Sequence, residues 1–216
     1  MTGNTAPRIG NLPREEWTDD ARGVFAFWGQ PGTWENGSPS NLTMVLANHP
    51  PLANAYHVFG KHLLIDTTIA ARPRELIVLR TAWLQKCEYE WHYHVGYALK
   101  AGLTMEEIAA VREGSTSPVW DGKDEDRAVL RAVDELVQDQ RISDETWAAL
   151  GQFFDKRQLM DFVFTVGNYV LLGWACATFG VPLEDGLDPI GFDLKTRSGN
   201  APEGGVRPLE NRGDRA

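Results

Sequence analysis

The chain is poor in cysteine, with only Cys87 and Cys176 among 216 residues. Two cysteines exclude a disulfide-rich framework, and in a reducing compartment we expect two reduced thiols. The N-terminus, MTGNTAPRIGNLPREEW, lacks the apolar stretch that a secretory signal requires. The sequence therefore predicts a cytoplasmic protein.

Positive charge is also scarce. There are 21 Lys and Arg residues against 30 Asp and Glu residues, which leaves a net charge of -9 and a pI of about 5.0. A surface this acidic repels phosphate backbones, so nucleic acid is not an expected partner. No uninterrupted apolar run of about 20 residues occurs, which predicts that the chain does not span a membrane. The sequence contains neither a phosphate-binding glycine loop nor a GxSxG nucleophile elbow.

Hydrophobic residues make up 43% of the chain, which indicates a folded globule. Their spacing follows a helical period, and no convincing pair of strands is present. The sequence therefore predicts an all-α bundle of about eight helices, preceded by an N-terminal helix over 14–28. The eight helices are expected at about 40–48, 52–64, 73–86, 88–100, 105–112 and 124–138, then in a segment capped by Ser143, and at 157–179.

Three regions are expected along the chain. Residues 1–39 form an N-terminal helix and a turn-rich loop that carries Trp34, residues 40–184 form the helical domain, and residues 185–216 form a polar tail. The helix over 157–179 is apolar nearly all round, so it should be central or covered by an oligomer. Eight tryptophans in a chain of this size also favour a homo-oligomer.

Side chains that could take part in a reaction are concentrated between Arg74 and His94. On a helical wheel that starts at Cys87, Glu90 falls at about 300° and His94 at about 340°, whereas His92 falls at about 140°. Glu90 and His94 are i,i+4 neighbours that can form an acid–base pair, with the carboxylate orienting the imidazole. Cys87 lies at the expected helix N-terminus, where an imidazole can depress the pKa of a thiol.

Other interpretations of the same residues stay open. A Glu–His pair at this spacing is also common on helix surfaces, and a lone cysteine is often a small buried apolar residue. A metal site on His92 and His94 would need a strand, in which the two rings share a face, but the pattern here is helical. Glu75 cannot be placed by angle, because a helix break is expected near 86–88.

The chain resembles the carboxymuconolactone decarboxylase superfamily, which includes alkylhydroperoxidase D. The resemblance covers residues 42–115 well and the last predicted helix more weakly. It is carried by His49-Pro50-Pro51-Leu52, by Pro73-Arg74-Glu75-Leu76-Ile77-Val78-Leu79-Arg80, by Cys87-Glu88-Tyr89-Glu90-Trp91-His92-Tyr93-His94, by Ala98 and Gly102-Leu103-Thr104, and by Gly167-Asn168-Tyr169 and Thr178-Phe179-Gly180-Val181-Pro182.

The resemblance implies an all-helical fold, a homotrimer or hexamer, no organic cofactor and no metal. The peroxidase branch has a Glu, eleven residues, a Cys, two residues, a second Cys, three residues and a His. Glu75, Cys87 and His94 match that spacing, but Glu90 stands at the second cysteine. Peroxidase chemistry needs a resolving thiol, and Cys176 could supply it only if its helix approaches Cys87. The Tyr-Glu-Trp-x-x-His form more closely resembles the decarboxylase branch.

The sequence therefore favours a cofactor-free acid/base lyase or isomerase that acts on a small carbonyl, carboxylate or aromatic-derived metabolite. His94 would move the proton, Glu90 would orient it, Glu75 could donate to the product, and Cys87 would not be essential. A thiol-dependent peroxidase that uses Cys87 is the alternative, and a non-catalytic oligomeric binder is the third. The expected substrate pocket comprises Tyr89, Trp91, Tyr97, Arg80, Asn168 and Tyr169, with Arg74 as a second candidate for binding a carboxylate.

Overall fold

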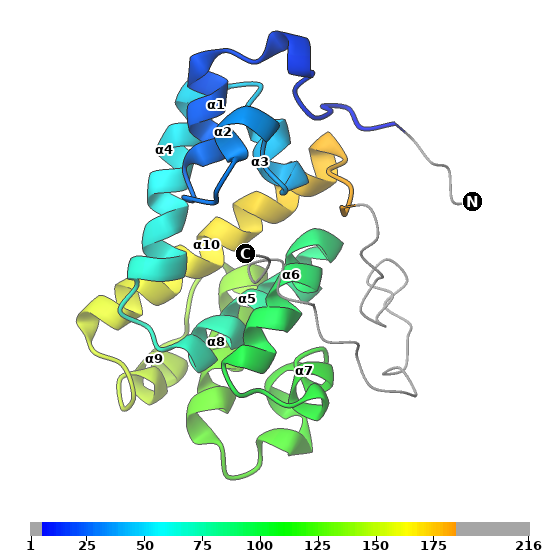
Figure 1. Cartoon of the computed structure of the whole chain (residues 1–216). Coiled ribbons are helices and arrows are strands. Elements are labelled where there is room, and N and C mark those ends of the chain that lie inside the picture. The colour runs from blue at the N-terminus through cyan, green and yellow to red at the C-terminus, as the bar shows by residue number, and fades with distance from the viewer. Residues whose placement is uncertain (1–5, 185–216) are drawn as a thin grey trace. The chain divides into compact units, whose positions relative to one another are not determined.

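The structure is a computed structural model that describes residues 6–184 (Figure 1). Within that range the ordered elements are helices, and no strand occurs, so the predicted all-α class is confirmed. The described residues divide into two compact units. One comprises residues 6–68 and 171–184, and the other comprises residues 69–170. The predicted tail over 185–216 lies outside the described residues.

The first unit contains short helices around a small core. Thr18 and Ser40 cap two of these helices by accepting hydrogen bonds from the backbone N–H groups of Ala21 and Thr43. The core is formed by Leu12, Ala21, Val24, Phe25, Ala47 and Ala53. The elements are η1 (Arg14–Glu16), α1 (Asp19–Ala26), α2 (Thr33–Asn36), α3 (Asn41–Leu46), α4 (Pro50–Lys61) and η2 (His62–Asp66).

The second unit contains the segment from which chemistry is expected. Its helices pack around α5, which contacts both α6 and α8. Helix α10 continues from this unit into the first at residue 171. The elements are α5 (Ala71–Gln85), α6 (Glu88–Lys100), α7 (Met105–Ala110), η3 (Gly114–Thr116), η4 (Pro118–Trp120), α8 (Asp124–Asp139), α9 (Asp144–Leu150) and α10 (Lys156–Phe179).

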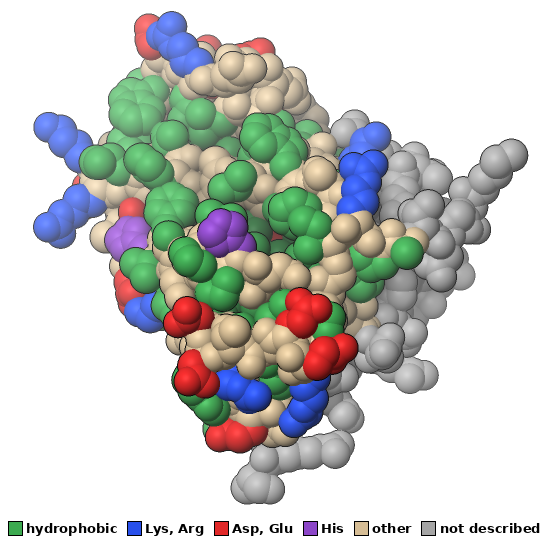
Figure 2. Space-filling model, turned by 90° about the horizontal axis from the view of Figure 1, so that it is seen from above, with side chains coloured by type: hydrophobic (Ala, Val, Ile, Leu, Met, Phe, Trp, Pro, Cys, Tyr) green, Lys and Arg blue, Asp and Glu red, His purple; other side chains and the backbone are tan. Residues whose placement is uncertain are grey.

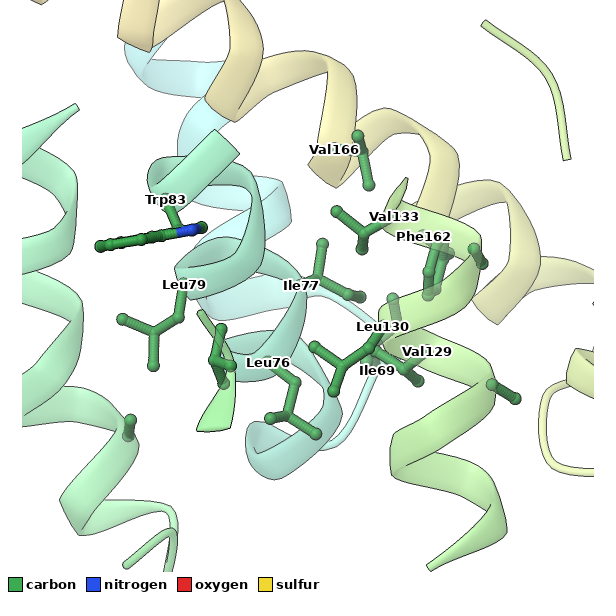
Figure 3. Close-up of a cluster of buried hydrophobic side chains, with 14 of the residues drawn as sticks. Ile69, Leu76, Ile77, Leu79, Trp83, Val129, Leu130, Val133, Phe162 and Val166 are labelled. Atoms are coloured by element: carbon green, nitrogen blue, oxygen red, sulfur yellow. The ribbon is translucent and has the colours of Figure 1, made fainter. Parts of the chain in front are cut away.

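Helix α5 is the central helix of the second unit. Ten of its 15 residues are buried, including the charged residue Glu75. Apolar side chains of α5 pack against those of α8 and α10, as Figure 3 shows. The labelled members of this core are Ile69, Leu76, Ile77, Leu79, Trp83, Val129, Leu130, Val133, Phe162 and Val166. We expected the helix over 157–179 to be central or covered by an oligomer. In the structure α10 is only partly covered by other residues of the chain, and α5 is the central helix of the second unit.

The connection between α5 and α6 positions the candidate site. Lys86 adopts a left-handed backbone conformation, with φ of 55°, and ends α5. The backbone N–H of Cys87 then donates to the carbonyl of Ala82 at 2.9 Å, and Cys87 becomes the N-cap residue of α6. The predicted break near 86–88 is therefore confirmed, and the short connection folds α6 back against α5.

Several predicted boundaries are confirmed and others are wrong. Helix α6 and the capping box of Thr104 and Glu107 on α7 are as predicted. The helix predicted over 14–28 is instead a 3₁₀ turn followed by α1, because Thr18 caps a new helix after Trp17. The loop predicted over 29–39 contains the short helix α2. The expected loop over 113–122 contains two 3₁₀ turns.

Arg80 belongs to a buried structural network. Its Nε donates to Asp134 at 2.6 Å, and its Nη1 donates to the carbonyls of Val111 and Arg112 at 2.9 and 2.8 Å. Gly114 makes room for this arrangement. Its φ is 76°, and a Cβ atom there would lie 2.7 Å from Arg80 Nη2. Arg80 was expected to bind substrate. In the structure its guanidinium instead donates three hydrogen bonds to residues of the same unit, which hold neighbouring elements together.

Helix α10 is long and apolar enough to cross a membrane when judged by length and composition alone. The sequence predicted this helix as apolar nearly all round, and it predicted no membrane span. The core helix of a soluble protein passes the same test, and 44% of the apolar window is buried inside the chain. Figure 2 shows hydrophobic side chains exposed on one face of the molecule.

Candidate functional site

Three side chains from three helices of the second unit meet in its interior. Glu75 comes from α5, His94 from α6 and Tyr169 from α10. Their exposed fractions are 0%, 4% and 5%, so the groups interact with one another rather than with bulk water. A cluster of titratable groups buried this deeply is a candidate functional site, because burial and close partners change proton affinity.

Glu75 is the partner of His94 Nδ1. Its Oε2 lies 2.7 Å from that nitrogen, and its Oε1 accepts from Arg74 Nε and Nη2, each at 2.9 Å. Burial alone would raise the pKa of Glu75, but the charges and hydrogen bonds of His94 and Arg74 outweigh it and lower that pKa. Glu75 is therefore a carboxylate that can only accept, so Nδ1 of His94 carries the proton.

The second ring nitrogen of His94 faces a phenol. The hydroxyl of Tyr169 lies 3.0 Å from Nε2, and the two rings meet edge to face at 89°, with their centroids 5.0 Å apart. Because Nδ1 donates to Glu75, Nε2 of the neutral ring is an acceptor, and the phenol donates to it. The ring is thus held at both nitrogens by groups from different helices.

Glu90 lies beside His94, as its spacing predicted, but it does not form the hydrogen bond that would orient the ring. Its Oε2 is 3.6 Å from Nε2 of His94, beyond hydrogen-bonding distance, whereas Glu75 makes the short contact at Nδ1. Burial raises the pKa of Glu90 to about 7, the neighbouring Cys87 adds to the rise, and His94 opposes it. The geometry therefore gives the orienting hydrogen bond to Glu75, and Glu90 is a carboxyl group that is partly protonated near neutral pH.

Cys87, Glu90 and His94 lie along one side of α6, as their spacing predicted. Cys87 is buried at the N-cap position and is close enough to Glu90 to change its pKa. Cys176 is also buried, but it belongs to the first unit. His92 is buried as well, and its ring meets that of Tyr93 edge-on at 6.0 Å.

The aromatic residues expected to shape a pocket have different surroundings. The ring of Tyr97 lies 5.3 Å from that of His94 and is 43% exposed, so Tyr97 is the part of the site that reaches the surface. Burial raises the pKa of Tyr97, and the carboxylates of Glu75 and Glu90 add to the rise. Two other rings pack elsewhere: Trp91 lies in the apolar core against Trp83, and Tyr89 packs against Tyr93.

Asn168 and Arg74 complete the set of predicted residues. The carbonyl oxygen Oδ1 of the buried Asn168 has no hydrogen-bond partner among the described residues, so it is available to a donor on a ligand. Arg74 was expected to bind a substrate carboxylate, but its guanidinium is bound to Glu75. The sequence contained the signal for this pair, since a cation directly precedes the acid, but it could not show that Glu75 contacts His94.

The described chain offers no ready cation site. Within residues 6–184, no three His, Cys, Asp or Glu side chains are grouped so that they could hold a metal ion. Two surface grooves of the second unit, of about 320 and 370 Å³, are lined by residues other than those that surround His94. Among Glu75, Glu90, Tyr97 and Tyr169, which surround His94, Tyr97 is the exposed side chain.

Solved structures with similar folds include peroxidase-related proteins and a debrominase. An uncharacterized peroxidase-related protein from Silicibacter sp. TM1040 superposes with a TM-score of 0.67 at 16% identity, over 84% of this chain and 94% of that one. The alkylhydroperoxidase AhpD core protein from Ralstonia eutropha JMP134 superposes with a TM-score of 0.64 at 18% identity, over 89% and 98%. At these identities the similarity shows the fold alone.

A third similar structure has a bound small molecule. The debrominase Bmp8, with a cysteine-to-alanine substitution and in complex with 2,3,4-tribromopyrrole, superposes with a TM-score of 0.65 at 16% identity. The superposition covers 85% of this chain and 94% of that one.

No curated protein matches the chain significantly. A family sequence model does match part of it. Residues 50–135, which include α5 and α6 with Glu75, Glu90 and His94, match the sequence model of the carboxymuconolactone decarboxylase family. This match covers less than half of the chain, and together with the shared helical fold it supports the resemblance to the carboxymuconolactone decarboxylase and alkylhydroperoxidase D-like superfamily.

Proposed function

We propose that this protein is a cofactor-free acid/base enzyme, a lyase or isomerase, in which His94 transfers the proton and Glu75 orients it. The observation that carries the proposal is the buried 2.7 Å contact between Glu75 and Nδ1 of His94, supported on its other side by Arg74. A buried carboxylate fixes the tautomer of an imidazole and stabilises the imidazolium that forms when the ring takes a proton.

This arrangement suits reactions at a carbon next to a carbonyl group. Loss of CO₂ or of a proton leaves an enolate, which needs a nearby acid to return a proton. His94 as imidazolium and Glu90 in its protonated form can both act as that acid, because the pKa of Glu90 lies at about 7. The aromatic rings of Tyr97 and Tyr169 flank the imidazole, which favours a small, flat substrate with a carbonyl or carboxylate group.

A thiol reaction is the second candidate. Cys87 lies at the N-terminus of α6, which favours an anion, and close to the carboxyl group of Glu90, which could supply or take its proton. Bmp8, which has a similar fold, is a debrominase whose complex was obtained with a cysteine replaced by alanine. In a peroxidase, Cys87 would be oxidised to a sulfenic acid that an external thiol reduces.

Replacing His94 should remove most of the acid/base activity. With a panel of small keto acids and unsaturated lactone carboxylates, we expect His94→Ala to lower kcat roughly 10²–10⁴-fold on any compound that the wild type converts. Glu75→Gln should cost more than Glu90→Gln, because Glu75 holds Nδ1. Steady-state kinetics of the three variants test this, and equal losses at Glu75 and Glu90, or none at His94, would contradict it.

Replacing Cys87 separates the two candidates. If the reaction is acid/base chemistry, Cys87→Ala should retain kcat within about threefold, since no bond to sulfur is made, and alkylation of the thiol should have a similarly small effect. The same preparations should be assayed for consumption of hydroperoxides and of halogenated pyrroles in the presence of a dithiol. Turnover there that disappears in Cys87→Ala would assign the protein to thiol chemistry.

The pKa of Glu90 makes stability depend on pH. The carboxyl has a value of 4.5 when unperturbed and about 7 in the fold, so the folded state holds its proton more tightly. Stability is therefore lost as pH rises from about 4.5 to 7, by an amount on the order of 3 kcal/mol. We expect Glu90→Gln to become progressively more stable than the wild type over that range in urea titrations.

Glu75→Gln is the matched control, because its effect on stability should depend on pH in the opposite direction. The pKa of Glu75 is lowered by folding, so its stabilising contribution is present above the unfolded value and is lost as pH falls. Glu75→Gln should therefore be less stable than the wild type at neutral pH, and the gap should close in acid. A Glu90→Gln difference that does not vary between pH 5 and 8 would show that Glu90 is not protonated in the fold.

We also propose that the protein is a cytoplasmic homo-oligomer, a trimer or hexamer. The support is a set of large apolar side chains that remain exposed around α9 and α10 of the second unit: Trp147, Phe153, Met160, Val163 and Phe164. Light scattering should give three or six times the 24.1 kDa of one chain, and Phe164→Asp should lower the mass. A wild-type particle of one chain mass at micromolar concentration would contradict the proposal.

A further inference from the structure

Tyr169 lies at the catalytic end of the Glu75–His94 pair. Its hydroxyl is 3.0 Å from Nε2 of His94, the ring nitrogen that the Glu75 contact leaves available for proton transfer. The side chain is buried, and it comes from α10, whereas Glu75 and His94 come from α5 and α6. The contact joins residues 75 positions apart, so it is a product of tertiary packing rather than of helix spacing.

The hydrogen bonds of this cluster run in one direction. Arg74 donates to Glu75, and the lowered pKa of that carboxylate leaves it only able to accept from Nδ1 of His94. Nε2 is then the acceptor, and the Tyr169 hydroxyl donates to it. Glu90, at 3.6 Å from the same nitrogen, is too distant to replace the phenol in this state. A hydroxyl, an imidazole and a carboxylate stand in the order that activates the serine of serine hydrolases.

This order decides which atom meets a substrate. Nε2 already accepts a hydrogen bond from Tyr169, so the next atom outward along the chain of hydrogen bonds is the phenol oxygen. A phenol ring in this position can also stack on a flat substrate. The hydroxyl of Tyr169 therefore has both the contact and the chemistry to exchange a proton.

We propose that Tyr169 is a catalytic residue, the group that exchanges the proton with the substrate on behalf of His94. This rests on the proposed acid/base function. As the substrate C–H bond breaks, its electron pair moves into the carbonyl to form an enolate, and its proton passes to the Tyr169 oxygen. The hydroxyl proton of Tyr169 passes at the same time to Nε2, which forms an imidazolium beside Glu75. Protonation of the enolate reverses both transfers, so the residues return to their starting state.

The hydrogen-bond order can be tested without a substrate. In full-length protein labelled with ¹⁵N-histidine, at a pH where the ring is neutral, we expect His94 to be protonated at Nδ1 and unprotonated at Nε2. Tyr169→Phe, which keeps the ring but removes the hydroxyl, should shift the Nε2 resonance and leave the proton on Nδ1, hydrogen-bonded to Glu75. Tyr93→Phe, in the same unit, should shift neither nitrogen. Protonation at Nε2, or a spectrum unchanged in Tyr169→Phe, would overturn the proposal.

Turnover supplies a second readout. On a compound that the wild type converts, Tyr169→Phe should lower kcat by roughly 10²–10⁴-fold with little change in KM, the effect of losing an acid/base group. The Tyr169→Phe/His94→Ala double variant should be no slower than His94→Ala alone, because both residues serve one transfer. Tyr93→Phe should keep the wild-type kcat.

The two proposals can fail separately. If Tyr169→Phe keeps full kcat while His94→Ala loses it, the role of Tyr169 is overturned and the acid/base function stands. If instead Cys87→Ala abolishes turnover and His94→Ala does not, the proposed function fails, and the role of Tyr169 fails with it even where the predicted tautomer is found.

Discussion

The buried contact between Glu75 and His94 is the interaction on which the rest of the site depends. A carboxylate with no solvent-exposed surface is costly unless it is paired and hydrogen-bonded on both oxygens. Arg74 and His94 meet that requirement from two sides. The pair forms because Lys86 ends α5 in a left-handed conformation and α6 folds back along it, which brings residues 19 positions apart into contact.

The two carboxyl groups beside His94 differ because their partners differ. Glu75 touches a guanidinium and an imidazole, and its pKa falls in spite of burial. Within residues 6–184 no such cation lies within hydrogen-bonding distance of Glu90, so burial raises the pKa of Glu90 to about 7, and the neighbouring Cys87 adds to the rise. Pairs of acids separated in this way by their surroundings can serve as a fixed anion and a proton donor in one site. Glu90 also occupies the position where the peroxidase branch has its second cysteine, so an acid replaces a redox group.

The sequence predicted much of the fold through local signals. The bounds of α6, the capping box of Thr104 and the shared face of Cys87, Glu90 and His94 all follow from periodicity and helix capping. The orienting partner of His94 could not be predicted, because Glu90 is the neighbour by spacing while Glu75 comes from another helix across a break. Tyr169 was expected to shape a pocket, but its bond to Nε2 also depends on tertiary packing. Likewise, nothing local shows that Arg80 is committed to Asp134.

The most direct test of the central claim is the source of the new hydrogen in the product. The reaction is run in D₂O on the first compound that the wild type converts by losing CO₂, so that the new C–H bond cannot take its hydrogen from the substrate, and deuterium at carbon is measured by mass spectrometry and NMR. Proton transfer by the Glu75–His94 pair predicts one solvent deuterium at carbon, formed at the wild-type rate by Cys87→Ala and at background rate by His94→Ala. A product without solvent deuterium at carbon, or one whose formation needs Cys87 and not His94, would contradict it.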